Sequence, residues 1–247
     1  MKNLEGKNAL VTGGNSGIGY ATALELKQQG AQVIITGRRT EAVDKAAAEL
    51  GVYGKVADQA SLDSIEELAQ HVSDRFGKID ILFINAGVTG KSTIEQTSES
   101  FWHQLTDVNL KGAYFTLSRL IPILRDGASV IFLSSTVATR TIPGSSVYAL
   151  SKAAINSVVK TAALELAPRK IRVNAISPGP TETEVFDKMG LDHDRIQEVK
   201  GALKSKIPLA TLGDPADVAK MVAYLSSAQS RFITGSEILI DGGMTLL

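Results

Sequence analysis

A tyrosine and a lysine four residues apart, Tyr148 and Lys152, are the residues whose types and spacing point most directly to catalysis. In a helix, positions four apart lie on one face, so both side chains reach the same space. A free phenol, with a pKa of about 10, is a poor acid–base catalyst at neutral pH, but a nearby ammonium lowers that pKa. The pair therefore predicts proton transfer by Tyr148, although such pairs are also common on the surfaces of helices.

Polar residues follow two of the expected strands at the point where each strand ends. Ser135 follows a strand expected over residues 129–134, and Asn85-Ala86-Gly87 closes a strand expected over residues 79–85. Ligands of open parallel sheets bind at the carboxyl ends of the strands. We therefore expect Ser135, Tyr148 and Asn85 to share one edge of a sheet.

A glycine-rich turn, Thr12-Gly13-Gly14-Asn15-Ser16-Gly17-Ile18-Gly19, lies between an expected strand and an expected helix. Glycines let the backbone approach a pyrophosphate, whose charge then meets the free N–H groups at the start of the helix. The spacing G-x-x-x-G-x-G differs from the common G-x-G-x-x-G fingerprint, and no P-loop lysine follows. The turn predicts dinucleotide binding, with a plain tight turn as the alternative.

The residues that follow the second expected strand indicate which dinucleotide is used. An NAD site usually places an acid about 20 residues into the unit, to bind the ribose 2′-hydroxyl. That position is Gly37 here, and Arg38 and Arg39 follow it. Because arginine suits a 2′-phosphate, the sequence favours NADP(H) over NAD(H). The alternative is two solvated arginines in a loop.

The elements that must position these residues alternate along the whole chain. Short Val- and Ile-rich runs separated by helical segments indicate a parallel sheet covered on both faces. We predict a single doubly wound, Rossmann-type α/β domain over residues 1–247, with a seven-stranded parallel sheet. The strands are expected at 8–12, 32–36, 52–57, 79–85, 129–134, 172–176 and 237–240, and the helices at 17–29, 41–50 (capped by Thr40), 61–76 (capped by Ser61), 101–124, 148–167 and after Asp214.

Two other features of the pattern bear on function. Residues 181–210 are polar and contain no expected strand, so we expect a substrate-binding lid there. The segments 101–124 and 148–167 are apolar nearly all round, and such helices need cover on their outer sides. A symmetric partner is the simplest cover, so we predict a homotetramer, with a dimer as the alternative. The apolar end of the chain, residues 244–247, is a candidate second contact.

Composition excludes several classes of function. Lys plus Arg number 26 and Asp plus Glu number 26, and this balance argues against a nucleic-acid binder. The absence of cysteine excludes disulfides, thiolate metal sites and cysteine nucleophiles. No stretch of the sequence approaches 18 consecutive apolar residues, so we predict no membrane span and expect a cytoplasmic protein. The three histidines are far apart in the sequence, and we predict no metal site.

Taken together, these motifs resemble those of the short-chain dehydrogenase/reductase family, and the resemblance covers essentially all 247 residues. Tyr-x-x-x-Lys at 148–152, with a serine 13 residues before the tyrosine, matches the family spacing. Ile84 and Gln59 depart from the residues usual in the family. The other marks, in family order, are TGGNSGIG at 12–19, Asp58, INAG at 84–87, Asn109, Arg172-Val-Asn174 and Pro178-Gly179.

The resemblance implies hydride transfer between nicotinamide C4 and a carbonyl or alcohol carbon. Tyr148 is then the proton donor, Ser135 stabilises the substrate oxygen, Lys152 lowers the Tyr148 pKa and holds the ribose, and Asn109 keeps a water in place. Asp58 and Gln59 are expected near the adenine, and Pro178–Thr183 at the nicotinamide. The expected cofactor contacts are Gly13, Asn15, Ser16, Gly17, Ile18, Gly19, Arg38, Arg39, Asp58, Gln59, Asn85, Ala86, Gly87, Tyr148, Lys152, Pro178, Gly179, Thr181 and Thr183.

These features predict an NADP(H)-dependent oxidoreductase of the alcohol dehydrogenase or carbonyl reductase type, acting on a small ketone or secondary alcohol. A 3-oxoacyl-carrier-protein reductase is the nearest alternative, and would need a basic patch such as Lys200, Lys204 and Lys206. A catalytically silent NADP-binding regulator is the alternative from another class, but such proteins typically lose the tyrosine or lysine present here. The sequence does not identify the substrate, because substrate loops vary freely on one scaffold.

Overall fold

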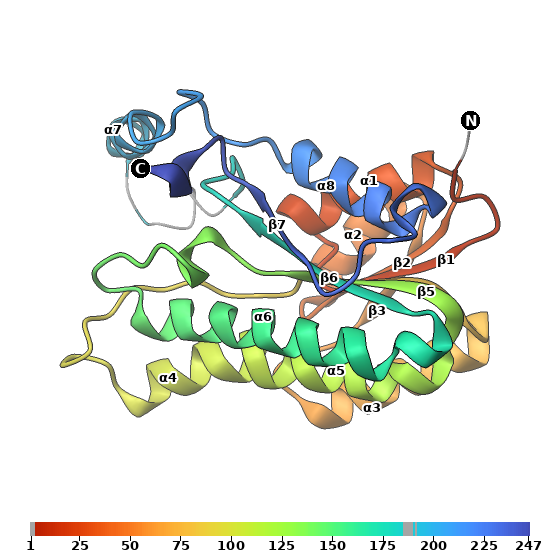
Figure 1. The fold of residues 1–247 in the computed structure, drawn as a ribbon. Helices are drawn as coiled ribbons and strands as arrows, with labels where there is room; N and C mark the ends of the chain where they lie inside the picture. Colours follow the sequence, from red (N-terminus) through yellow and green to blue (C-terminus); the bar gives the residue numbers. More distant parts are fainter. Residues whose placement is uncertain (1–2, 185–189, 191) are drawn as a thin grey trace.

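A seven-stranded parallel sheet forms the centre of the computed structural model, which describes residues 3–184, 190 and 192–247 (Figure 1). Its order, β3-β2-β1-β4-β5-β6-β7, confirms the predicted doubly wound, Rossmann-type sheet. Its strands are β1 (Asn8–Val11), β2 (Gln32–Gly37), β3 (Tyr53–Val56), β4 (Ile79–Ile84), β5 (Leu124–Leu133), β6 (Arg172–Pro178) and β7 (Glu237–Ile240).

The strand order reverses beside β1, and this reversal positions the functional edge. Val11 of β1 pairs with Ile35 of β2 on one side and with Phe83 of β4 on the other. From β1 the chain therefore adds β2 and β3 on one side of β1, and then crosses back to place β4 on the other side of β1. Loops that leave the two strands diverge there and create a crevice at their carboxyl ends.

Helices cover both faces of the sheet (Figure 1). The helices α1 (Gly17–Gln28), α2 (Thr40–Leu50) and α8 (Pro215–Ser226) pack on one face through a buried core that includes Leu26, Leu50 and Val222. The core of the other face includes Leu68, Leu117 and Ile155. They belong to α3 (Leu62–Phe76), α5 (Ala113–Leu120) and α6 (Ser146–Glu165), and α4 (Glu99–Thr106) lies at the end of this layer.

Polar side chains set the start of several helices. The Ser64 N–H donates to Ser61 Oγ at 3.2 Å, so the expected cap at Ser61 is present. Asp214 also caps its helix, since its Oδ1 accepts from the Ala216 N–H at 2.7 Å. The expected cap at Thr40 is wrong. Thr40 is the first residue of α2, and Arg39 precedes the helix without a side-chain capping bond.

The single helix expected over residues 101–124 is also wrong, because this stretch divides into several segments. After α4, residues Asp107–Gly112 form a π-helical turn, α5 follows, and residues Ile121–Ile123 form a short 3₁₀ turn. Pro122 lies in that turn, and because proline cannot donate an N–H it ends the α-helix. As a result β5 begins at Leu124, five residues before the expected strand.

The outer face of α6 is less apolar than we expected. Its buried residues include Val147, Ile155 and Val159, as the periodicity predicts. The exposed side carries Ala153, Ser157, Lys160, Thr161 and Leu164. Three of these are polar, so the expectation that little polar face remains is wrong for this helix. Leu164, 78% exposed, is the large apolar side chain on that face.

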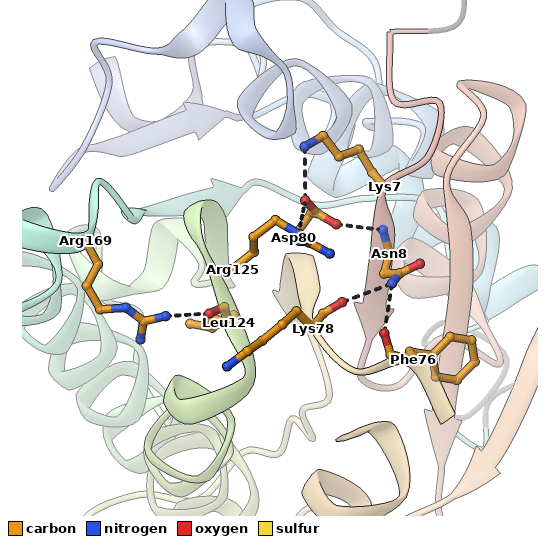
Figure 2. Close-up of polar contacts among 8 residues, drawn as sticks. All are labelled: Lys7, Asn8, Phe76, Lys78, Asp80, Leu124, Arg125 and Arg169. Atoms are coloured by element: carbon orange, nitrogen blue, oxygen red, sulfur yellow. Dashed lines mark hydrogen bonds and ion pairs between the residues drawn. The ribbon is translucent and has the colours of Figure 1, made fainter. Parts of the chain in front are cut away.

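An ion cluster holds the amino ends of three neighbouring strands together (Figure 2). The Asp80 carboxylate of β4 is almost buried and accepts from Lys7 Nζ at 3.0 Å and from the Asn8 N–H of β1 at 3.0 Å. Arg125 Nε of β5 lies 3.2 Å from the same carboxylate. This cluster lies at the edge of the sheet opposite the expected site, so we assign it a structural role.

The expected lid, residues 181–210, contains one helix among its described residues. α7 (His193–Lys204) begins after Asp192, whose side chain accepts from the Arg195 N–H. The apolar residues of α7, Leu203 among them, pack with Ile207 and with Met244 near the end of the chain. Residues 185–189 and 191 of the expected lid lie outside the described residues. Within the described part of the chain, no helix is both long and apolar enough to span a bilayer.

Candidate active site

The carboxyl ends of β1 and β4 are joined through two side chains, Thr12 and Asn85. The N–H groups of Asn85 and Ala86 both donate to Thr12 Oγ1 at 3.0 Å. Asn85 Nδ2 in turn donates to the carbonyls of Thr12 at 2.8 Å and Gly13 at 3.1 Å. Asn85 therefore shapes the glycine turn from the neighbouring strand. Thr12 was not among the expected site residues, although a hydroxyl directly before the glycines was a visible signal.

The glycine turn is packed so closely that side chains do not fit at three of its positions. A Cβ atom on Gly13, which has a φ of +63°, would lie 2.9 Å from Ala86 Cα. On Gly14 it would lie 2.6 Å from Ile35 Cγ2, and on Gly19 2.2 Å from the Gly13 carbonyl oxygen. Ser16 precedes α1 without a side-chain capping bond, which leaves N–H groups of the first helical turn available to an anion.

The segment after β6 reaches this turn. A Cβ atom on Gly17 would lie 3.4 Å from Thr183 Cγ2, so Thr183 covers the start of α1. Gly179 follows Pro178, the last residue of β6, and donates its N–H to the Ile240 carbonyl at 2.9 Å. Thr181 Oγ1 donates to the Gly179 carbonyl at 3.0 Å. The structure thus brings this segment and the glycine turn together, and its expected place at the nicotinamide stays a prediction.

The end of β2 places Asn15 beside the two arginines. Gly37 is buried, and a Cβ atom there would lie 2.3 Å from Asn15 Oδ1. Arg38 and Arg39 are exposed, and neither guanidinium has a hydrogen bond or ion pair with the described residues. A larger residue at position 37 therefore requires Asn15 to move, which the sequence did not indicate.

Asp58 and Gln59 follow β3 and lie in different environments. Asp58 is exposed, and its Oδ1 accepts from the Ala60 N–H at 3.0 Å. Gln59 is buried, and its Nε2 has no hydrogen-bond partner among the described residues. A buried amide donor without a partner is costly unless a ligand or water satisfies it. Gln59 is therefore the stronger candidate for a ligand contact.

Tyr148 and Ser135 come together although they belong to different elements. Tyr148 lies in the first turn of α6, and Ser135 follows β5. The two side chains are close enough for the Ser135 hydroxyl to lower the pKa of the Tyr148 hydroxyl. Lys152, one helical turn after Tyr148, is buried, and its Nζ lies 5.9 Å from the centre of the Tyr148 ring and donates to the Leu133 carbonyl at 2.7 Å.

Burial dominates the electrostatics of this pair. Burial raises the pKa of the Tyr148 hydroxyl, and the hydrogen bond with Ser135 opposes this effect only in part. Burial also lowers the pKa of Lys152 to about 8. The Lys152 ammonium donates to the Leu133 carbonyl, and the expected lowering of the Tyr148 pKa by its charge stays a prediction.

Asn109 lies in the π-helical turn Asp107–Gly112, a feature frequent at functional sites. Its Oδ1 accepts from the Val88 N–H and its Nδ2 donates to the Val88 carbonyl, both at 2.8 Å. A Cβ atom on Gly87 would lie 3.2 Å from Asn109 Oδ1 and 3.6 Å from Lys152 Nζ. Asn109 therefore orders the backbone that follows β4, close to Lys152, a role that the resemblance did not imply.

Gly112 and Ser151 support the site and were not predicted. A Cβ atom on Gly112 would lie 1.9 Å from the Gln59 carbonyl oxygen, so only glycine lets the π-helical turn approach this loop. Ser151 Oγ lies 3.4 Å from Asn109 Nδ2 and donates to the Tyr148 carbonyl at 2.7 Å. Neither residue carries a sequence signal, because both depend on contacts between remote segments.

A cavity of about 200 Å³ opens beside Ser135. It lies between the loop after β5, the segment after β6, α7 and the end of the chain. Asp241 holds that end, because its carboxylate accepts from the N–H groups of Gly243 and Thr245, and these hydrogen bonds outweigh desolvation and lower the pKa of Asp241. The described residues that line the cavity are Ser135, Thr136, Val137, Arg140, Ile142, Gly179, Pro180, Leu203 and Met244.

Ile142 also lines a larger cavity of about 600 Å³, and the described residues around that cavity include no charged side chain. No metal site is found beside either cavity. Within residues 3–184, 190 and 192–247, no three His, Asp or Glu side chains gather into a group that could hold a metal ion.

Comparison with known proteins places this geometry among enzymes. Residues 13–245 match the model of a family described as enoyl-(acyl carrier protein) reductase. A 3-oxoacyl-[acyl-carrier-protein] reductase of Thermotoga maritima is 37% identical, over 98% of this chain and 99% of its own. The human protein named dehydrogenase/reductase SDR family member 4 is 35% identical, over 97% of this chain and 88% of its own.

Solved structures agree with these relatives. A short-chain dehydrogenase/reductase described as glucose/ribitol dehydrogenase, from Brucella melitensis, superposes with a TM-score of 0.92 at 31% identity, covering 98% of each chain. Another structure, described as a short-chain dehydrogenase/reductase family protein, has a TM-score of 0.89 at 34% identity. That match covers 99% of this chain and 100% of the other.

Proposed function

The chain belongs to the short-chain dehydrogenase/reductase family of oxidoreductases, and from this premise we propose that it transfers hydride between NADP(H) and a ketone or secondary alcohol. The observation that carries the proposal is the pair of hydroxyls on Ser135 and Tyr148, which come from different elements and interact at the carboxyl edge of the sheet. Beside Ser135 lies a cavity of about 200 Å³, of a size for a small carbonyl compound.

The residues on this edge fit a nicotinamide dinucleotide, which supplies the hydride when bound. Gly13, Gly14 and Gly19 of the glycine turn leave no space for a side chain, and the buried Gln59 amide has a donor without a partner in the described part of the chain. Arg38 and Arg39 follow the side-chain-free position Gly37. Their guanidinium groups, which have no partner among the residues that the structure describes, support NADP(H) over NAD(H). In this proposal Ser16, Ile18 and Thr183 contact phosphate, and Ala86, Gly87 and Lys152 contact ribose.

The proton chemistry of the proposal follows from the surroundings of Tyr148. Because burial raises its pKa, the hydroxyl stays protonated at neutral pH and is a ready donor to a carbonyl oxygen. Ser135 hydrogen-bonds the same oxygen and stabilises the charge that develops on it. Below pH of about 8 Lys152 is charged and stabilises the phenolate left after proton transfer.

Reduction of 3-oxoacyl thioesters on a carrier protein is the second candidate, because several relatives carry that name. Such an enzyme needs a basic surface to dock its acidic carrier. Of the three lysines expected there, Lys200 pairs with Glu182. Lys204 and Lys206 are exposed and have no side-chain partner within the described residues. Two lysines form a weak patch, and we favour the small carbonyl substrate.

Two structural proposals accompany this function. Residues 181–210 act as a lid, since α7 contributes Leu203 to the cavity beside Ser135. The chain forms a homotetramer, or a dimer at least, through the layer of α4, α5 and α6. Large apolar side chains on this layer, Trp102, Tyr114 and Leu164, are 43%, 50% and 78% exposed. Leu246, 84% exposed near the end of the chain, supports a second contact.

A substrate screen tests the proposed function. Purified enzyme is incubated with NADPH and a panel of ketones, aldehydes, sugars and 3-oxoacyl thioesters, and the loss of reduced-nicotinamide absorbance is followed. We expect turnover of small ketones. Faster turnover of carrier-bound thioesters would favour the second candidate. No turnover of any compound, with bound NADPH detected by calorimetry, would support a cofactor-binding regulator instead.

A further inference from the structure

One charged residue that lines the cavity beside Ser135 has no partner for its side chain within the described part of the chain. Arg140 is the single charged residue among the described residues that line this cavity. Its guanidinium makes no hydrogen bond or ion pair with any residue that the structure describes. The walls around it include the apolar side chains of Val137, Ile142, Leu203 and Met244.

Other arginines of similar burial in this protein are satisfied. Arg169, also half-buried, donates to Asp126 at 2.8 Å and to the Ile121 carbonyl at 2.9 Å. Arg172, half-buried as well, donates to the Leu225 carbonyl at 2.6 Å. A guanidinium offers five N–H donors, and leaving them without acceptors beside apolar walls is unfavourable. Arg140 therefore has the donors for a ligand that brings its own acceptors.

We propose that the substrate is a small oxo acid, or the matching hydroxy acid, whose carboxylate binds Arg140. A carboxylate matches the planar guanidinium through two parallel hydrogen bonds. Its carbonyl oxygen lies at Ser135 and Tyr148, and its short carbon chain contacts Ile142, Leu203 and Met244. This inference rests on the proposed function. The carbonyl carbon accepts the hydride of NADPH and the oxygen takes the Tyr148 proton, while the carboxylate is unchanged.

The test compares acids with their neutral esters. The probes are 3-oxobutanoate, 4-oxopentanoate and 5-oxohexanoate, which differ in the separation of carbonyl and carboxylate, and the methyl ester of each. We expect Arg140→Gln to lower kcat/KM for the preferred acid by about 10- to 100-fold more than for its ester, as the loss of a charge-assisted hydrogen bond implies. Arg231→Gln, a change at an exposed arginine outside the cavity, is the control and leaves both values unchanged.

A binding measurement separates this inference from the proposed function. Calorimetric titration of the full-length protein with pentanoate and with pentanamide requires no turnover. Tighter binding of pentanoate, lost in Arg140→Gln and kept in Arg231→Gln, supports the carboxylate site even if no ketone is reduced. Equal binding by the wild type and Arg140→Gln, or equal loss of acid and ester reduction in Arg140→Gln, would overturn it and leave a solvated arginine.

Discussion

At the scale of single residues, burial decides the chemistry of the Tyr148 and Lys152 pair. The i, i+4 spacing places both groups on one face of α6, but the pKa of each moves in the direction that disfavours its charge. A protonated phenol with a partly suppressed ammonium is suited to proton donation, and therefore to carbonyl reduction. Oxidation of an alcohol needs the phenolate and becomes faster as the pH rises.

Tyr148→Phe removes the proton donor and retains the ring. We expect kcat for ketone reduction to fall by roughly 10²- to 10⁴-fold, the usual contribution of general acid catalysis. The Kd for NADPH, measured by fluorescence titration, should change little. Activity of the Phe variant within about two-fold of the wild type would show that another group donates the proton.

The pH dependence of reduction should follow Lys152. Its pKa lies at about 8 because burial disfavours the ammonium, so the charge that stabilises the phenolate is present below that pH and lost above it. We expect kcat/KM for reduction to fall as the pH rises through about 8. In Lys152→Arg the charge persists, so the residual kcat/KM should no longer fall as the pH rises through about 8. A flat wild-type profile from pH 6 to pH 9.5 would contradict the assignment.

Cofactor preference is also a property of a few residues. Arg38→Gln should lower kcat/KM for NADPH by about 10- to 100-fold and leave the value for NADH nearly unchanged, while Arg39→Gln should have the smaller effect. Adding Gly37→Asp to the Arg38→Gln variant should move the preference toward NADH only if the Asn15 side chain moves away. A Cβ atom on residue 37 would lie 2.3 Å from Asn15 Oδ1. Equal wild-type efficiency with both cofactors would refute NADP(H) specificity.

At the scale of elements, the π-helical turn over Asp107–Gly112 links the loop that carries Gln59 to the start of α6. It carries Asn109, which binds Val88, and it approaches the Gln59 loop through Gly112. The ion cluster around Asp80 secures the same strands at their opposite ends (Figure 2). Strands held at their amino ends leave the carboxyl ends free to carry the functional loops.

Gly112→Ala tests the importance of this close approach. The new Cβ would lie 1.9 Å from the Gln59 carbonyl oxygen, so the turn must shift. We expect a loss of about 1–3 kcal/mol in the free energy of unfolding, with a larger loss of kcat as Asn109 moves. The matched control is Gly201→Ala in α7, where nothing lies within 4 Å of the added atom. It should be neutral or stabilising by up to about 1 kcal/mol. Equal effects of the two changes in urea unfolding would contradict this account.

At the scale of the whole molecule, the layer of α4, α5 and α6 is a candidate contact between copies of the chain. Leu164 is exposed beside small and polar residues of α6, which allow close packing of a second helix. The opposite layer, of α1, α2 and α8, carries fewer large exposed apolar groups, Leu24 and Tyr224, each 39% exposed.

Leu164→Glu should weaken association, because it places a charge in the centre of the proposed contact. Light scattering coupled to size-exclusion chromatography should show a homotetramer for the wild type and smaller species for the variant. Leu24→Glu, on the opposite layer, is the control and should leave the mass unchanged. A stable, active wild-type monomer of 26.2 kDa at micromolar concentration would refute the assembly.

The sequence by itself determined the parallel sheet, the glycine turn, the placing of Tyr148 and Lys152 on one helix face, and the position of Ser135 at the carboxyl edge of the sheet. Each is encoded in local periodicity, or in residue types next to a strand end. Only the tertiary structure decided the π-helical turn, the bond from Lys152 to Leu133, the contact of Thr183 with Gly17, and the unpaired Arg140. These features depend on burial and on the distance between segments remote in the chain. Spacing along a helix or strand establishes which face a side chain occupies, but not which remote atoms meet it there.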